Sequence, residues 1–197
     1  MTEADLATAR PPGRPRSADV DVAILRATLE EYGEHGFGVM SVEGVAARAG
    51  VGKATIYRRY GSKLDLVRDA MYWSAQFKPT PDTGTLLGDL DGILTNLDDL
   101  VHDPVLGPSL HHMTADGARH PELRALYDEF LQHRRAGTKA VLRRAIERGE
   151  LQPGTDLELA TDVLTGPVML RHLSTHMPID RAFLTGVRDA FLRLYGT

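Results

Sequence analysis

Residues 41–63, SVEGVAARAGVGKATIYRRYGSK, have the pattern of two short helices joined by a tight turn. Ser41 can accept hydrogen bonds from the free backbone N–H groups of a helix start. Small apolar residues then recur at the spacing of one buried helical face: Val42, Val45, Ala46 and Ala49. Gly50 follows, and a residue without a Cβ readily adopts the left-handed conformation that ends a helix. The segment therefore predicts a helix-turn-helix.

The second helix of this segment is expected from about residue 52 to residue 60. Ile56 and Tyr60 lie one turn apart on its inner side. Its other side presents polar and basic residues: Lys53, Thr55, Tyr57, Arg58 and Arg59. A helix fits the major groove of DNA, where Lys and Arg reach base edges or phosphates. The pattern predicts a DNA-binding face, and the alternative is an ordinary helical hairpin whose charges face solvent.

A longer stretch, roughly residues 14–72, resembles the DNA-binding domain of the TetR (tetracycline repressor) family of transcriptional regulators. The match includes GRPR at residues 13–16, then ILRATLEEYGEHGF, SVEGVAARAGV and KATIYRRYGSKLDLV. The resemblance implies that Thr55, Tyr57, Arg58 and Arg59 contact DNA from the recognition helix and that Lys63 contacts a phosphate. With the cap and the N-terminal arginines, the predicted DNA-binding residues are Arg14, Arg16, Ser41, Lys53, Thr55, Tyr57, Arg58, Arg59 and Lys63.

The chain departs from the family pattern at two places. Gly52 and Ala54 stand where relatives commonly have a polar cap and a glycine, which bears on base preference. Glu31 stands where an apolar residue is more usual in the first helix, which weakens the assignment of that position to the core.

Charge is unevenly distributed along the chain. The formal net charge is −4 at pH 7, which argues against attraction of nucleic acid to the whole surface. Between residues 48 and 68, however, one acid, Asp65, stands against six basic residues: Arg48, Lys53, Arg58, Arg59, Lys63 and Arg68. Positive charge is therefore expected where DNA would lie. The chain has no cysteine and no apolar run long enough for a membrane span, so we expect a cytoplasmic protein without membrane contact.

The sequence predicts three parts. Residues 1–16 contain a basic, proline-rich cluster and are expected to form a flexible arm that either enters an adjacent minor groove or is plainly disordered. Residues 17–62 form the expected helix-turn-helix domain, and residues 63–197 a helical domain for effector binding and dimerisation. The later helices are expected at roughly 84–101, 105–118, 121–149, 156–175 and 180–195. The fold class is all-α, with about nine helices, and Pro167 is expected to kink or unwind its helix.

The last two helices are the candidates for dimerisation. A single helix-turn-helix reads few base pairs, whereas a dimer reads two half-sites. The resemblance implies that these helices pair with their symmetry mates in a four-helix bundle. The predicted interface residues are Leu164, Val168, Phe183, Val187, Phe191 and Leu194. The alternative is that both apolar stripes face the core of their own protomer.

The resemblance also implies a ligand cavity among the middle helices, for an effector that the sequence does not identify. Candidate lining residues, which combine apolar and polar groups, are His111, His112, Met113, Tyr127, Phe130, Met169 and His172. His172 and His176 lie four residues apart, so their imidazoles share one helical face and a metal-responsive regulator is an alternative. Two ligands do not make a site, and we expect no metal and no cofactor.

An enzyme is the main hypothesis from another class of function. The chain contains no nucleophile elbow, no phosphate-binding glycine motif and no cysteine nucleophile, so no catalytic residue is predicted. An all-helical module that binds protein partners through its basic face is a third possibility. The preferred hypothesis is a homodimeric regulator, a repressor that binds a palindromic operator and is released by a small molecule.

Overall fold

The computed structural model describes residues 16–74 and 79–197. These residues form nine α-helices and no sheet. The helices are α1 (Arg16–Val39), α2 (Val42–Ala49), α3 (Lys53–Tyr57), α4 (Lys63–Ser74), α5 (Leu86–His102), α6 (Leu106–Gly117), α7 (Pro121–Glu147), α8 (Leu157–Leu170) and α9 (Arg181–Tyr195). The predicted all-α class is confirmed. Residues 1–15, which include Arg14, lie outside the described residues, and of Arg16 only the backbone at the start of α1 is described.

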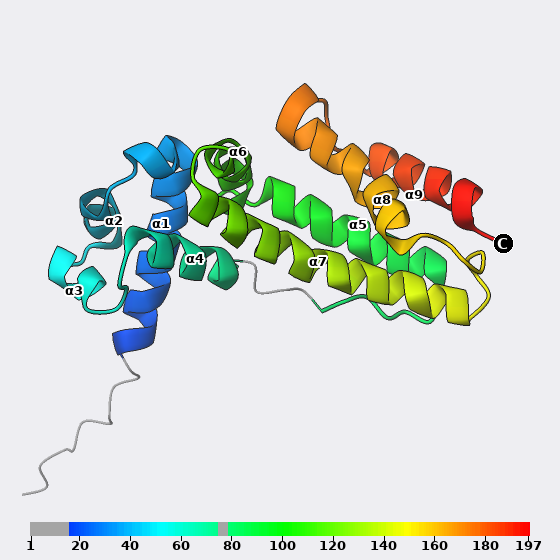
Figure 1. The fold of residues 1–197 in the computed structure, drawn as a ribbon, viewed down its shortest axis with the longest axis horizontal. Coiled ribbons are helices and arrows are strands. Elements are labelled where there is room, and N and C mark those ends of the chain that lie inside the picture. Colours follow the sequence, from blue (N-terminus) through cyan, green and yellow to red (C-terminus); the bar gives the residue numbers. More distant parts are fainter. Residues whose placement is uncertain (1–15, 75–78) are drawn as a thin grey trace, which may run out of the picture.

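The helices form two groups (Figure 1). Helices α1 to α4 gather at one end of the molecule, and α5 and α7 run side by side along its length. Helices α8 and α9 cover α5 at the other end, close to the C-terminus. The five helices predicted after residue 80 are found within two residues of their expected ends, if the short π-helix Arg171–Thr175 is counted with α8. None of the helices in the described ranges is long and apolar enough to cross a membrane.

Helix α1 bends at Gly36. Gly36 has φ 70° and ψ 170°, so the assigned helix is two helical pieces joined at a kink. The backbone N–H of Phe37, just past the kink, donates to Asp116 Oδ2 of α6 at 2.7 Å. A Cβ on residue 36 would lie 2.7 Å from His112 Nδ1, which leaves room for glycine alone. The kink therefore fastens the first helix to α6 in the second group.

Helix α8 continues through Pro167 rather than ending there. The irregularity follows at Arg171, where the hydrogen bonding changes to a π-helical turn that ends at His176 in the left-handed region (φ 52°). Proline lacks the N–H of a regular helical bond, and the π turn accommodates the changed register. The predicted local distortion is thus displaced by four residues along the helix.

The segment before α5 is held in place by one buried carboxylate, Asp89. Its Oδ1 accepts from the backbone N–H of Thr83 at 2.7 Å and from Thr83 Oγ1 at 2.9 Å. Its Oδ2 accepts from Arg148 of α7 at 3.2 Å, and the Asp89 side chain has no exposed surface. Burial raises the pKa of Asp89, but the hydrogen bonds from Thr83 and Arg148 outweigh it and hold that pKa below its ordinary value.

Asp89→Asn is expected to lower the free energy of unfolding by about 1–2 kcal/mol at pH 7, because it removes a charge-assisted network. A lowered pKa in the folded state stabilises above the unfolded pKa of about 4, and that contribution is lost as pH falls through the folded value. Urea unfolding between pH 3 and pH 7 measures both effects. Asp91→Asn, an exposed neighbour paired with Arg188, is the control. Identical pH profiles for Asp89→Asn and the wild type would contradict this role.

Candidate nucleic-acid interface and ligand cavity

Helices α2 and α3 and the turn between them have the predicted geometry. Ser41 Oγ accepts from the N–H of Gly44 at 3.0 Å, so Ser41 caps the start of α2. Gly50 closes α2 in the left-handed conformation, with φ 65° and ψ 32°. Its N–H lies within bonding reach of the Ala46 and Ala47 carbonyls. The two helix ends are therefore satisfied by the residues that the sequence assigned to them.

Helix α3 is shorter than predicted, because regular α-helical structure ends at Tyr57. The chain continues as a turn in which the N–H groups of Arg59 and Tyr60 both donate to the Ile56 carbonyl at 2.9 Å. Ile56 is buried, whereas Tyr57 is 53% exposed. Lys53 and Arg58 are exposed as well, and Thr55 is half-buried. The polar face of α3 thus lies at the surface, at the far end of the molecule from α8 and α9 (Figure 1).

Most of the basic residues in this region already bind acids or carbonyls of the same chain. The acidic partners come from α1, α2 and α4. All of them except Asp65 lie outside residues 48–68, the range in which the sequence shows one acid. Arg48 pairs with Glu31 and Glu34, Lys53 with Glu43, Arg59 with Asp21, and Arg68 with Asp65 and Asp69. Arg58 differs, since it makes no hydrogen bond or ion pair with any residue that the structure describes. Much of the positive charge expected at this surface is therefore compensated by acids of the same chain.

Lys63 has a structural role at the end of α1. Its Nζ donates to the carbonyls of Phe37 at 2.6 Å and Met40 at 3.3 Å. The ammonium also lies 4.4 Å from the centroid of the Phe37 ring. A cation is favourable against carbonyls that lack a helical partner. Contact of Lys63 with a phosphate, as the resemblance implies, would require it to leave or share these partners.

Glu31 owes its unusual position to Arg48 and Gly44. The Glu31 side chain is 9% exposed, and its Oε2 accepts from Arg48 Nε at 2.7 Å. A Cβ on residue 44 would lie 2.2 Å from Glu31 Oε1, so the glycine makes the space for the carboxylate. Glu31 and Arg48 thus form an ion pair that holds α1 against α2, and Gly44 leaves room for it. The departure from the family pattern at Glu31 is explained by these two residues of α2.

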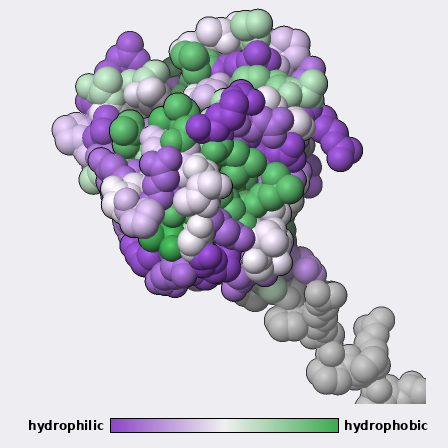
Figure 2. Space-filling view, turned by 90° about the vertical axis from the view of Figure 1, so that its right-hand side faces the viewer, coloured by the Kyte–Doolittle hydropathy of each residue, from purple (hydrophilic) through white to green (hydrophobic). Residues whose placement is uncertain are grey.

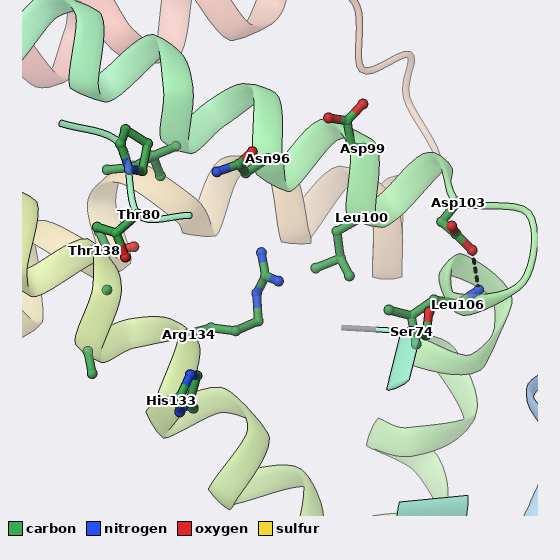
Figure 3. Close-up of a pocket in the computed structure, with 14 residues that line it drawn as sticks. Ser74, Thr80, Asn96, Asp99, Leu100, Asp103, Leu106, His133, Arg134 and Thr138 are labelled. Carbon is green, nitrogen blue, oxygen red and sulfur yellow. Dashed lines mark hydrogen bonds between the residues drawn. The ribbon is translucent and has the colours of Figure 1, made fainter. Parts of the chain in front are cut away.

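A cavity of about 370 Å³ lies between α5, α7 and the segment before α5 (Figure 3). Apolar walls come from Ile93, Leu100 and Leu106, and polar groups from Asn96, Arg134 and Thr138. Ser74, at the end of α4, and Asp103, just before α6, also line it. The cavity has the size and the mixed lining of a small-molecule site. It touches the ends of two helices that pack against α1.

The predicted pocket residues do not line this cavity. Met113 and Phe130 are buried in the core, and Tyr127 and Met169 pack against it half-buried. His111, His112 and His172 line a separate, open depression beside Gly107 and Pro108. Residue type alone selected them. The cavity instead forms where α5 and α7 diverge next to the segment at residues 79–85, a feature of packing that the helical pattern does not encode.

Comparisons with known proteins identify the family. Residues 24–70 match the model of bacterial regulatory proteins of the tetR family, and residues 80–191 match that of the tetracyclin repressor-like C-terminal domain. The HTH-type transcriptional regulator YdeS of Bacillus subtilis (strain 168) is 31% identical over 93% of this chain and 91% of its own length. The chain belongs to the TetR family of transcriptional regulators. The predicted resemblance is confirmed, and the protein is a DNA-binding transcriptional regulator.

Two further members of the TetR family extend the comparison. The DNA-binding transcriptional repressor TetR of Mycobacteroides abscessus is 32% identical over 91% of this chain and 93% of its own. The crystal structure of the TetR family transcription regulator SCO0332 superposes with a TM-score of 0.68 at 28% identity, covering 89% of this chain and 97% of that one. The likeness thus spans both the helix-turn-helix and the C-terminal helices.

The predicted dimer residues of this TetR-family chain divide into two sets. Leu164, Val168 and Phe191 have no exposed surface, and Val187 is 8% exposed. These four are buried in the core of the protomer and offer little surface to a partner. Leu194, in contrast, is 60% exposed, and Phe183 is half-buried. Both α8 residues of the set therefore face inward, whereas two of the four α9 residues keep exposed surface.

Three histidines of this regulator form a small cluster between α6 and the end of α8. The ring centroids of His111 and His172 are 4.5 Å apart, and those of His111 and His176 are 5.8 Å apart. His111 Nε2 lies 2.9 Å from the His172 carbonyl, and His172 Nε2 lies 3.1 Å from the Gly107 carbonyl. Burial lowers the pKa of His172. Across the described ranges no three His, Asp or Glu side chains are arranged to hold a metal ion, so the metal-sensor alternative has no supporting geometry.

Proposed function

We propose that this regulator binds a palindromic operator as a homodimer, represses transcription there, and is released by a small-molecule effector. The observation that carries the proposal is the exposed surface of Tyr57 on α3 and of Arg58 just after it, because Arg58 has no partner among the residues that the structure describes. An arginine without an internal partner is the side chain best placed to bind a guanine edge or a phosphate. The relative named as a transcriptional repressor supports repression.

Dimerisation through α8 and α9 is supported by their outer surfaces. Leu159, Leu170 and Leu194 are each more than half exposed. Gly166 and Gly186 have open space where a Cβ would be, so a second helix can approach closely. Figure 2 looks at the end of the molecule that carries the C-terminus and shows hydrophobic residues grouped near its middle, with hydrophilic residues around them. Such an apolar area with a polar rim is typical of a protein interface.

Release by an effector is supported by the position of the cavity. Ser74 at its edge ends α4, and Leu106 at its edge begins α6. Helix α6 in turn bonds to α1, because Ser109 Oγ donates to the Leu29 carbonyl at 3.2 Å and Asp116 accepts from Phe37. A ligand that moves either helix end therefore displaces the helix-turn-helix. In a dimer such a displacement changes the distance between the two recognition helices, which must match the spacing of the half-sites.

Arg58→Ala is expected to weaken operator binding by about 10-fold or more, since a good base contact is worth about 1–3 kcal/mol. A gel-shift titration with duplexes from the region upstream of the protein's own coding sequence measures this affinity. Arg143→Ala, an exposed arginine on α7, is the matched control and should leave it unchanged. If both variants bind the duplex as the wild type does, the recognition face is assigned wrongly.

A further inference from the structure

Among the described residues that line the cavity between α5 and α7, Arg134 is the one Lys or Arg side chain. Figure 3 shows it extending from α7 into the middle of the cavity, with its guanidinium directed toward α5 and Asn96. The side chain is partly buried, and this burial lowers the pKa of its guanidinium. An arginine nevertheless keeps its charge inside a protein. The cavity therefore presents a fixed cation to whatever enters it.

Arg134 has no anionic partner among the residues that the structure describes. Its recorded contact is with the ring of Phe130, one turn earlier on α7, whose centroid lies 6.0 Å from the guanidinium carbon. The next residue shows the contrast, since Arg135 binds the carboxylates of Glu158 and Asp162. Removing a guanidinium from water without pairing it with an anion costs free energy. Arg134 is therefore better explained as a group that binds a ligand than as one that stabilises the fold.

The two carboxylates that line the same cavity are directed elsewhere. Asp103 Oδ1 accepts from the backbone N–H groups of Val105 at 2.9 Å and Leu106 at 2.7 Å, where it caps the start of α6. Asp99 points away from Arg134 in Figure 3. These acids add negative charge around the cavity, which disfavours a ligand with two negative charges, such as a phosphate monoester. One guanidinium with two carboxylates nearby therefore favours a ligand with one negative charge.

The remaining lining defines the rest of the ligand. Ile93, Leu100 and Leu106 offer an apolar surface, while the Asn96 amide and the Thr138 hydroxyl offer hydrogen bonds near Arg134. We propose that the cavity binds a small organic acid whose carboxylate pairs with Arg134 and whose apolar body packs against these three residues. A planar carboxylate accepts two parallel bonds from a guanidinium. This inference rests on the proposed release by an effector and names the chemical class of that effector.

The test uses three probe acids, 4-phenylbutyrate, octanoate and 2-naphthoate, each matched with its neutral primary amide. Trp73 is the one tryptophan of the chain and precedes Ser74 at the cavity edge, so its fluorescence reports binding alongside calorimetry. At least one acid is expected to bind the full-length protein with a Kd below about 1 mM and its amide about 10-fold more weakly. Binding of no acid, or equal binding of acid and amide, would overturn the proposal.

Variants of two arginines locate the site. Arg134→Met is expected to weaken acid binding by about 10-fold or more, Arg134→Lys by less, and Arg143→Met not at all. Arg134→Met is also expected to raise the thermal midpoint of the free protein, because it removes an unpaired charge, whereas Arg135→Met should not. Undiminished acid binding by Arg134→Met overturns the proposal. A lowered thermal midpoint for Arg134→Met would also overturn the proposal, because it would show that Arg134 is already paired.

Operator binding, measured on the same samples, separates this inference from the proposed function. If an acid binds through Arg134 and operator affinity falls when it is added, both stand. If the acid binds and operator affinity is unchanged, the site stands but release by this ligand fails. If no acid binds while a neutral compound releases the operator, the proposed function stands and the acid proposal is wrong.

Discussion

Phe191→Ala is expected to lower the free energy of unfolding of this regulator by about 3–5 kcal/mol, the usual cost of truncating a fully buried phenylalanine. Phe191 has no exposed surface, and its ring lies 4.9 Å from that of Tyr195. It joins α9 to the core of the same protomer. The loss is measured by urea unfolding at a fixed protein concentration, because the proposed dimerisation would also contribute to apparent stability.

Leu194→Ala on the same helix is the matched control. Because Leu194 is 60% exposed, its removal should change the unfolding of an isolated protomer by less than about 0.5 kcal/mol. In sedimentation, Leu194→Lys should shift the equilibrium toward monomer. If Phe191→Ala dissociated the dimer without lowering the stability of the protomer, the assignment of Phe191 to the core would be contradicted.

Arg48→Met is expected to destabilise the helix-turn-helix domain by about 3 kcal/mol, because it leaves the Glu31 carboxylate buried without its cation. The double variant Glu31→Leu with Arg48→Met should recover most of this loss, since a well-packed apolar pair replaces a buried ion pair at little cost. Thermal and urea unfolding of the two single variants and the double variant form a double-mutant cycle.

The control for this cycle is Arg26→Met, which breaks an exposed pair with Glu30 and should cost no more than about 1 kcal/mol. Additive losses in the double variant would show that Glu31 and Arg48 do not act as a pair. In the sequence, an acid at position 31 departs from the family pattern. In the structure, the same acid is one member of the ion pair that holds α1 against α2.

Helix positions were predictable from the sequence because their signals are local. The cap at Ser41 and the left-handed turn at Gly50 depend on residues within a few positions of each other. Partners of charged residues were not predictable in this way. Arg59 lies 38 positions from Asp21, so its pairing is visible only once α1 and the turn after α3 are packed together.

The cavity was the least predictable feature. Its lining comes from the ends of α4 and α6 and from facing sides of α5 and α7, so it depends on how helices diverge rather than on where they begin. Arg134 carries no sequence signal that separates it from Arg135, its neighbour on an amphipathic helix. The two differ in the partners that folding supplies, since within the described ranges only Arg135 pairs with an acid.

The acids held beside the recognition surface have a consequence for how this regulator searches a genome. Lys53 and Arg59 each bind a carboxylate, and Lys63 binds carbonyls, so a random phosphate must compete with partners that are already present. Non-specific binding to DNA is almost wholly electrostatic, whereas a matched sequence adds base contacts. Internal compensation of charge would therefore remove a larger share of the affinity for arbitrary DNA than of the affinity for the proposed operator, to which base contacts also contribute. More of the protein would then stay free of arbitrary DNA.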